Sequence, residues 1–193
     1  MASTRRIGAA DSKTRAKLLD VAERLMIEEG YPAVTSRRLG READLSNQLV
    51  HYYFRTMDEL FLEVFRRRAE EGFARFRKAM DANPSLRTVW AFSGGGPGAG
   101  FNIEFAAMAN HRKAIRTEMA RYAEQFRTMQ LDAIAEVLAD HPSLPDGLTP
   151  DVILVTMTGV AQTMALEEAL GVTAGHDATL AFIDDLVDQL DQG

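Results

Sequence analysis

The sequence contains no cysteine among its 193 residues. This absence excludes disulfide bonds, thiol nucleophiles and thiolate metal sites. Strands are not expected either, because no stretch alternates polar and apolar residues over a strand's length. Leu, Ala, Met, Glu and Arg, which favour helix, are frequent instead. We therefore expect an all-α protein.

Long apolar runs are also missing. No stretch approaches the roughly 18 apolar residues of a membrane span. Residues 1–15 contain three arginines but lack the apolar run that a signal peptide needs. The sequence thus predicts a soluble, cytoplasmic protein with no membrane partner.

Basic residues are absent from the last third of the chain, where Arg127 is the final one, and the net charge is −6. Residues 1–70 carry 13 Lys and Arg against 11 Asp and Glu, whereas residues 71–193 carry 9 against 17. A basic head on an acidic body would orient the head toward DNA, although this asymmetry alone is weak support.

Residues 35–54, TSRRLGREADLSNQLVHYYF, are predicted to form two short helices joined by a tight turn. Thr35 and Ser46 are suitable N-caps, and the Ser46 hydroxyl can accept the free N–H of Leu49. The polar side chains left outside can reach phosphates and base edges, since Arg pairs with guanine and Asn or Gln with adenine. They are Ser36, Arg37, Arg38 and Arg41 on the first helix and Asn47, Gln48, His51 and Tyr52 on the second.

Amphipathic helices flank this pair. One is predicted over residues 12–29 and ends at Gly30. After the pair, Thr56 and Glu59 form a capping box that begins a long helix. Its three arginines at 66–68 are expected either to be solvated or to pair with acidic residues of the same helix.

With these helices assigned, residues 14–65 resemble the TetR family of bacterial repressors. The resemblance lies in a first helix ending EEGY, followed by TSRRLGREADLS and by LVHYYF with DELF after it. It implies a three-helix helix-turn-helix DNA-binding domain over 1–55 and a helical effector-binding and dimerisation domain over 56–193, with about nine helices in total. It also implies that a homodimer binds a palindromic DNA operator and that a small-molecule effector in the second domain releases the DNA.

The resemblance also indicates which side chains contact DNA. Asp44 occupies a turn position that is usually Gly, and Asp tolerates the left-handed conformation better than most residues. His51 replaces a common tyrosine and Met57 a common lysine, whose phosphate contact we assign to Arg55. The predicted DNA-contact residues are Thr35, Ser36, Arg37, Ser46, Asn47, Gln48, His51, Tyr52 and Arg55, over a core of Leu39, Ala43, Leu45, Val50 and Phe54.

Aromatic and methionine side chains of the second domain are predicted to line the effector site. A helical bundle of this size needs as many apolar side chains to pack, so a purely structural role is the competing interpretation. A helix kink is expected at Asn110 and His111. The predicted lining residues are Trp90, Phe101, Phe105, Met108, His111, Tyr122, Phe126, Met129 and Met157, with Asn102, Glu104, Glu118, Arg121 and Gln125 as further polar anchors.

The C-terminal segment is predicted to form a dimer interface. Residues 149–170, which Thr149 and Pro150 can begin as a helix, are apolar on nearly all sides, and residues 176–190 are amphipathic. Such a pair resembles half of a bundle that a two-fold symmetric second copy completes. The predicted interface residues are Val160, Met164, Leu180, Ile183, Val187 and Leu190.

Two other functions compete with a ligand-responsive repressor. A helical-bundle enzyme is not favoured, because the Glu-x-x-His pattern of carboxylate metal sites is absent and the four histidines lack ligand spacing. No cofactor or metal is therefore expected. A DNA-binding dimer that responds to a protein partner, or to nothing, stays open. The glycine-rich stretch 93–100 follows no strand and precedes no Lys-Ser or Lys-Thr pair, which favours a connector over a nucleotide loop.

Overall fold

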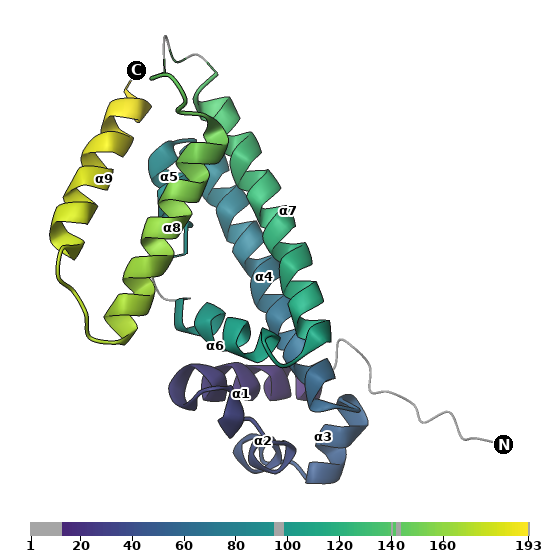
Figure 1. Cartoon of the computed structure of the whole chain (residues 1–193). Helices are drawn as coiled ribbons and strands as arrows, with labels where there is room; N and C mark the ends of the chain where they lie inside the picture. Colours follow the sequence, from purple (N-terminus) through teal and green to yellow (C-terminus); the bar gives the residue numbers. More distant parts are fainter. Residues whose placement is uncertain (1–12, 95–98, 140, 142–143, 193) are drawn as a thin grey trace. The chain divides into compact units, whose positions relative to one another are not determined.

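The computed structural model describes residues 13–94, 99–139, 141 and 144–192, and the regular structure in these ranges is entirely helical (Figure 1). The all-α prediction is therefore confirmed. Most of the glycine-rich connector, residues 95–98, lies outside the described residues. The described elements are α1 (Lys13–Glu29), the 3-10 helix η1 (Tyr31–Ala33), α2 (Ser36–Ala43), α3 (Asn47–Tyr53), α4 (Met57–Ala82), α5 (Leu86–Ala91), α6 (Ala99–Ala109), α7 (Lys113–Val137), α8 (Pro150–Ala169) and α9 (His176–Asp191).

These helices form two compact units. The N-terminal unit comprises residues up to 70 together with 104–120, and the C-terminal unit comprises 71–103 and residues from 121 onward. Helices α4, α6 and α7 each contribute residues to both units. The domain boundary that we expected after residue 55 remains a prediction.

The N-terminal unit is built on one apolar face of α1. Leu18, Ala22 and Leu25 are completely buried, at the four- and three-residue spacing of a helical stripe. Helix α2 packs against α1 and α3 against α2. From α6, the Phe105 ring contacts the Phe65 ring of α4 at 5.2 Å between centroids.

The arginines at 66–68 fasten neighbouring helices together. Arg67 pairs with Asp20 and Glu23 of α1, at 2.6 and 3.0 Å, and Arg68 also pairs with Glu23. Arg66 pairs with Glu63 of its own helix at 3.0 Å and with Glu118 of α7 at 2.5 Å. The expected pairing within one helix is confirmed for Arg66 and Glu63, but the sequence analysis did not predict the interhelical pairs. The interhelical partners are residues 44 or more positions away in the sequence.

The C-terminal unit has an apolar core to which α4, α5, α7, α8 and α9 all contribute. Its buried side chains are Phe76, Leu86, Val89, Ile134, Leu138, Ile153, Leu154, Met157, Ile183, Val187 and Leu190. Thr149 caps α8 by accepting the Val152 N–H at 3.4 Å, and Pro150 follows it, as predicted. The Asp191 carboxylate binds the first backbone N–H groups of α5, at Leu86 and Arg87, which ties the end of α9 to α5.

The helical structure is interrupted between α6 and α7, where a helix kink was expected. Helix α6 ends at Ala109 and α7 begins at Lys113. The His111 N–H bonds the Met108 carbonyl at 3.1 Å, which closes a turn. None of the described helices is both long enough and apolar enough to cross a membrane.

Candidate nucleic-acid interface

The turn between α2 and α3 has the geometry that the sequence indicates. Asp44 adopts the left-handed conformation, with φ 55° and ψ 47°, which confirms the assignment of this position. The Leu45 N–H then reaches back to the Gly40 carbonyl at 2.8 Å. Gly40 is required by the close approach, because a Cβ there would lie 2.8 Å from the Leu45 carbonyl oxygen. The turn therefore depends on a glycine in α2 as well as on Asp44.

Both helices of the pair are capped as expected. The Thr35 hydroxyl accepts the Arg38 N–H, and the Ser46 hydroxyl accepts the Leu49 N–H, each at 3.2 Å. Four of the five predicted core residues, Leu39, Ala43, Val50 and Phe54, are buried, whereas Leu45 is half-buried because it belongs to the turn. The backbone from Thr35 to Phe54 is thus held by local caps and by the core beneath it.

The predicted DNA-contact residues lie together on the outside of this motif. All are exposed except Ser36, which is half-buried. Within the described part of the chain, the side chains of Arg37, Asn47, Gln48 and His51 have no hydrogen-bond or ionic partner. The Tyr52 ring rests edge-on against Tyr53 at 5.2 Å. The surface therefore presents unpaired donors and acceptors of the kind that bind base edges and phosphates.

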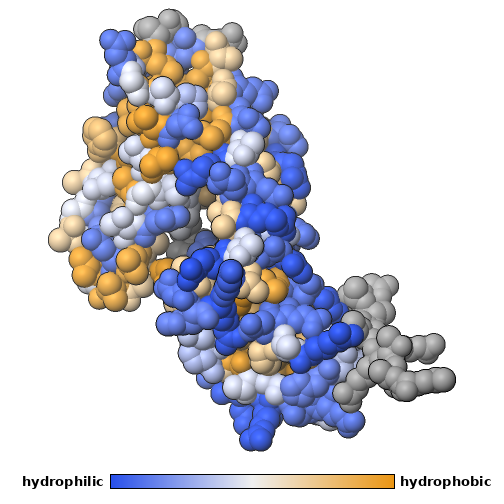
Figure 2. All heavy atoms as spheres, turned by 45° about the vertical axis from the view of Figure 1, so that its right-hand side comes forward, coloured by the Kyte–Doolittle hydropathy of each residue, from blue (hydrophilic) through white to orange (hydrophobic). Residues whose placement is uncertain are grey.

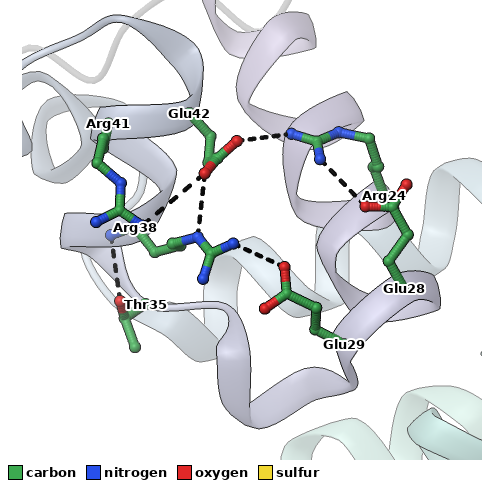
Figure 3. Close-up of polar contacts among 7 residues, drawn as sticks. All are labelled: Arg24, Glu28, Glu29, Thr35, Arg38, Arg41 and Glu42. Carbon is green, nitrogen blue, oxygen red and sulfur yellow. Dashed lines mark hydrogen bonds and ion pairs between the residues drawn. The ribbon is translucent and has the colours of Figure 1, made fainter.

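Arg38, which we grouped with these residues, has another role (Figure 3). Its guanidinium binds Glu42 at 3.1 Å and Glu29 at 2.7 Å, and Arg24 of α1 binds Glu42 at 3.1 Å and Glu28 at 3.2 Å. The hydrogen bonds from Arg24 and then from Arg38 hold the pKa of the Glu42 carboxyl below its ordinary value. Glu42 in turn raises the pKa of Arg24. Arg38 therefore joins α2 to α1 and is not available to DNA.

Arg41 was left out of the predicted contact residues, yet it is among the most accessible cations of the motif. Its side chain is 71% exposed, and its contact with Glu42 is a long 3.9 Å. The sequence holds a signal that separates the two arginines, because Glu42 follows Arg38 by four residues and can pair with it along the helix. Arg41 belongs with Arg37 on the free polar face.

The entry into α2 is fixed by a carboxylate of α6. Glu104 accepts the Tyr31 N–H at 2.7 Å, directly after Gly30, whose φ is +82°. A Cβ on Gly30 would lie 3.3 Å from the same carboxylate. Glu104 and Glu118, which we considered as polar anchors of an effector site, both bind partners within the N-terminal unit, and their role toward an effector remains a prediction.

The predicted effector residues are divided between the two units. Phe105 and Met108 are buried in the N-terminal unit, and His111 is exposed in the turn after α6. Met157 is a core residue of the C-terminal unit, and the half-buried Trp90, Phe126 and Met129 pack against that core. Phe101 and Tyr122 are buried in the C-terminal unit as well. Most of these side chains therefore pack in the core of one unit or the other, which agrees with the purely structural interpretation of these residues.

The predicted dimer residues need a correction. Ile183, Val187 and Leu190 are 3%, 0% and 8% exposed, because they fill the chain's own core, so a second copy cannot contact them. Val160 and Met164 are half-buried and Leu180 is exposed. The large apolar side chains that α8, α9 and their connection do leave exposed are Val152, Val155, Leu166, Leu170, Val172, Leu180 and Phe182.

Comparison with known proteins bears on this motif directly. Residues 18–64, which span most of α1, the capped pair and the start of α4, match the family model of bacterial regulatory proteins of the tetR family. This match supports a TetR-family regulator. The TetR-type head is thus a DNA-binding helix-turn-helix domain. No curated protein sequence matches the chain.

Solved structures extend the TetR likeness to the whole fold. A transcriptional regulator from Saccharomonospora viridis, in complex with choline, is 17% identical, with a TM-score of 0.77 over 90% of this chain and 95% of the other. A TetR-family protein from Rhodococcus sp. is 19% identical, with a TM-score of 0.72 over 91% and 99%. The multidrug binding protein EbrR, complexed with imidazole, is 25% identical, with a TM-score of 0.57 over 82% and 87%.

Proposed function

We propose that this chain is a cytoplasmic repressor that binds a palindromic operator as a homodimer and leaves it when a small apolar or amphipathic effector binds the C-terminal unit. The observation that carries the proposal is the row of exposed, unpaired side chains on α2 and α3, Arg37, Asn47, Gln48 and His51. Side chains already bound to protein partners would have to give up those bonds before they could read DNA. These four are free to do so.

The roles within the interface follow from side-chain chemistry. Arg37, Asn47 and Gln48 can each form two hydrogen bonds to one base edge, so we assign them to base reading. The hydroxyls of Thr35, Ser36 and Ser46 and the Arg55 guanidinium suit phosphate oxygens, as do His51 and Tyr52. Arg41 joins the phosphate group because it is highly exposed. Together these contacts would orient α3 toward the major groove.

Selection of binding sites from random double-stranded DNA tests this function. The full-length protein should enrich an inverted repeat, because a two-fold dimer presents two identical motifs. A variant with both Asn47→Ala and Gln48→Ala should enrich no such repeat, while Glu70→Ala, an exposed change on α4, should leave the selected sequence unchanged. Failure of the wild-type protein to enrich any sequence would refute the proposal.

The dimer is proposed to form through the exposed apolar side chains of α8 and α9. Leu170 is 72% exposed, Phe182 64% and Val155 55%. Apolar side chains so exposed on adjoining elements usually mark an interaction surface. The free backbone space at Gly159, where an added Cβ would meet nothing within 4 Å, would allow a second helix to come close. A two-fold arrangement of α8 and α9 would cover these residues on both chains.

The effector is the third part of the proposal. The S. viridis regulator binds choline and EbrR binds imidazole, which shows that a similar fold accommodates small molecules in those proteins. For this chain, the C-terminal unit offers mainly aromatic and aliphatic side chains. We therefore propose an effector whose bulk is apolar.

A further inference from the structure

The buried side-chain amide of Gln130, on α7, has a nitrogen that forms no hydrogen bond within the described residues. The residue is only 5% exposed, and its Nε2 atom has no hydrogen-bond partner among the described residues. A buried donor without a partner is unfavourable, because the hydration that it loses on folding is not replaced. Such groups are rare in native proteins and call for an explanation.

The neighbours of Gln130 along the helix make the amide more unusual. Tyr122, Phe126, Gln130 and Ile134 recur every four residues on α7, and Leu138, directly after the helix, continues the row. The other four are buried or half-buried and belong to apolar packing. A leucine or methionine at position 130 would suit this stripe better. The glutamine is therefore a local departure from the packing pattern, and such departures concentrate at functional sites.

Other buried polar groups have ordinary explanations. Ser93, 3% exposed, donates its hydroxyl to the Val89 carbonyl at 3.0 Å. Arg67 leaves its Nε unpaired, but its two other nitrogens bind Asp20 and Glu23. His141 also has an unpaired ring nitrogen, although this residue is only half-buried. Among these groups, Gln130 combines deep burial with a donor that forms no bond.

Aromatic rings surround this stretch of α7. Phe126, one turn before Gln130, stacks on Phe73 at 5.4 Å and meets Phe76 edge-on at 5.2 Å. Phe73 also contacts Tyr122 at 5.7 Å, and Phe76 contacts Phe92 at 5.4 Å. We call these five rings the ring cluster. It provides flat apolar surfaces that begin one helical turn before Gln130, all within the C-terminal unit.

We propose that Gln130 is the hydrogen-bond donor that anchors the effector, and that the effector combines an aromatic body with an oxygen acceptor such as a carbonyl. This inference rests on the proposed effector response. The aromatic body would pack among rings of the ring cluster, and the acceptor would bind Nε2. Because the chain's own atoms cover Nε2, the effector reaches it only by displacing the side chains above it. The bond then exists only in the bound conformation, which is the differential contact that shifts a conformational equilibrium.

Two probes test the proposal: 2-acetylnaphthalene and 2-ethylnaphthalene. They have the same carbon skeleton, but only the first has a carbonyl group, where the second has a methylene. Trp90, the single tryptophan of the chain, packs on the same core and reports binding through its fluorescence. The wild-type protein should bind the ketone about ten-fold more tightly than the hydrocarbon, the range expected for one buried hydrogen bond. In Gln130→Met, which keeps the side-chain length, this preference should vanish. Gln189→Met, the same change at an exposed position of α9, should retain it.

Thermal unfolding of the ligand-free proteins gives an independent readout. Gln130→Met should melt at a higher temperature than wild type, because it removes the unsatisfied donor, and should bind operator DNA as wild type does. A lower melting temperature would show that the amide is satisfied in the folded chain and would overturn the proposal. Equal binding of the two probes by wild type, or binding of neither, would also overturn it. If the wild-type protein did not bind DNA, that result would instead refute the proposed function.

Discussion

The two units differ in the contacts that join the helices within each of them. In the N-terminal unit, ion pairs join α1 to its neighbours: Arg15 to Glu63, Arg67 to Asp20 and Glu23, and Arg38 to Glu29. In the C-terminal unit, an apolar core joins five helices, and Arg87 binds Asp184 and Asp188 of α9 at its surface. Figure 2 shows the same contrast outside: blue hydrophilic atoms dominate the N-terminal unit in that view, and orange apolar atoms gather on the C-terminal unit.

This contrast separates two uses of arginine. Arg24, Arg38 and Arg66 to Arg68 are matched by acidic partners, so they contribute structure and little net field toward DNA. Arg37, Arg41 and Arg55 remain as the cations that an incoming phosphate would meet. In the C-terminal unit, where no basic residue follows Arg127, binding must depend mainly on apolar contact. Substitutions in each unit can test this division between a polar N-terminal unit and an apolar C-terminal unit.

The largest effect is expected from a charge placed inside the C-terminal unit. Ile183→Asp should lower the free energy of unfolding by more than about 4 kcal/mol, because the carboxylate would be buried among apolar side chains without a partner. Phe182→Asp, one residue away but exposed, should change the unfolding of the monomer by less than about 0.5 kcal/mol. Chemical denaturation and sedimentation measure the two properties separately. Phe182→Asp should abolish the dimer and leave the monomer folded, and a folded Ile183→Asp monomer would contradict our description of the core.

A glycine-to-alanine substitution should change the free energy of unfolding in opposite directions in the two units. Gly40→Ala in α2 should destabilise the chain by about 1 to 3 kcal/mol, because the new methyl group would lie against the Leu45 carbonyl oxygen. Gly72→Ala in α4, whose added Cβ meets only the end of Arg75 at 3.9 Å, should stabilise it by about 0.5 to 1 kcal/mol. Urea denaturation measures both. Two changes of the same sign would mean that the turn at Gly40 is looser than described.

These residues also indicate what sequence can and cannot predict. Ser46 as a cap and Asp44 as the left-handed residue were predictable, because both roles depend on a few adjacent residues. The apolar stripe of Ile183, Val187 and Leu190 was recognised, but periodicity does not say whether the chain itself or a second copy covers it. Gln130 was missed for the same reason, since its burial depends on distant helices. Local chemistry thus predicted the head better than the body.

The free arginines of the head should differ in how they contribute to DNA binding. Arg37→Ala should cost about 1 to 3 kcal/mol on the selected operator and relax the preference at one base pair of each half-site. Arg55→Ala should weaken binding to all sequences alike and reduce the salt dependence by about one phosphate contact. Titrations at several salt concentrations, with operator and unrelated DNA, separate the two patterns. Equal losses on both DNAs for Arg37→Ala would remove it from the base-reading group.

The smallest effect concerns the carboxylate at the centre of the network in Figure 3. Arg24 and Arg38 hold the pKa of Glu42 below its ordinary value of 4.5, so folding favours the charged carboxylate. Because this pKa is lower in the folded than in the unfolded chain, the stabilisation is fully present above the unfolded value and is lost as the pH falls through the folded value. Glu42→Gln should therefore loosen the packing of α2 on α1 at pH 7, and by less at pH 3, which is below the ordinary pKa of the carboxyl. Amide hydrogen exchange in α2, measured on wild type and Glu42→Gln at the two pH values, detects this local effect. Equal protection in the two proteins at pH 7 would show that the ion pairs on this exposed surface contribute nothing to the position of α2, and that the buried Leu39 and Ala43 alone hold it against α1.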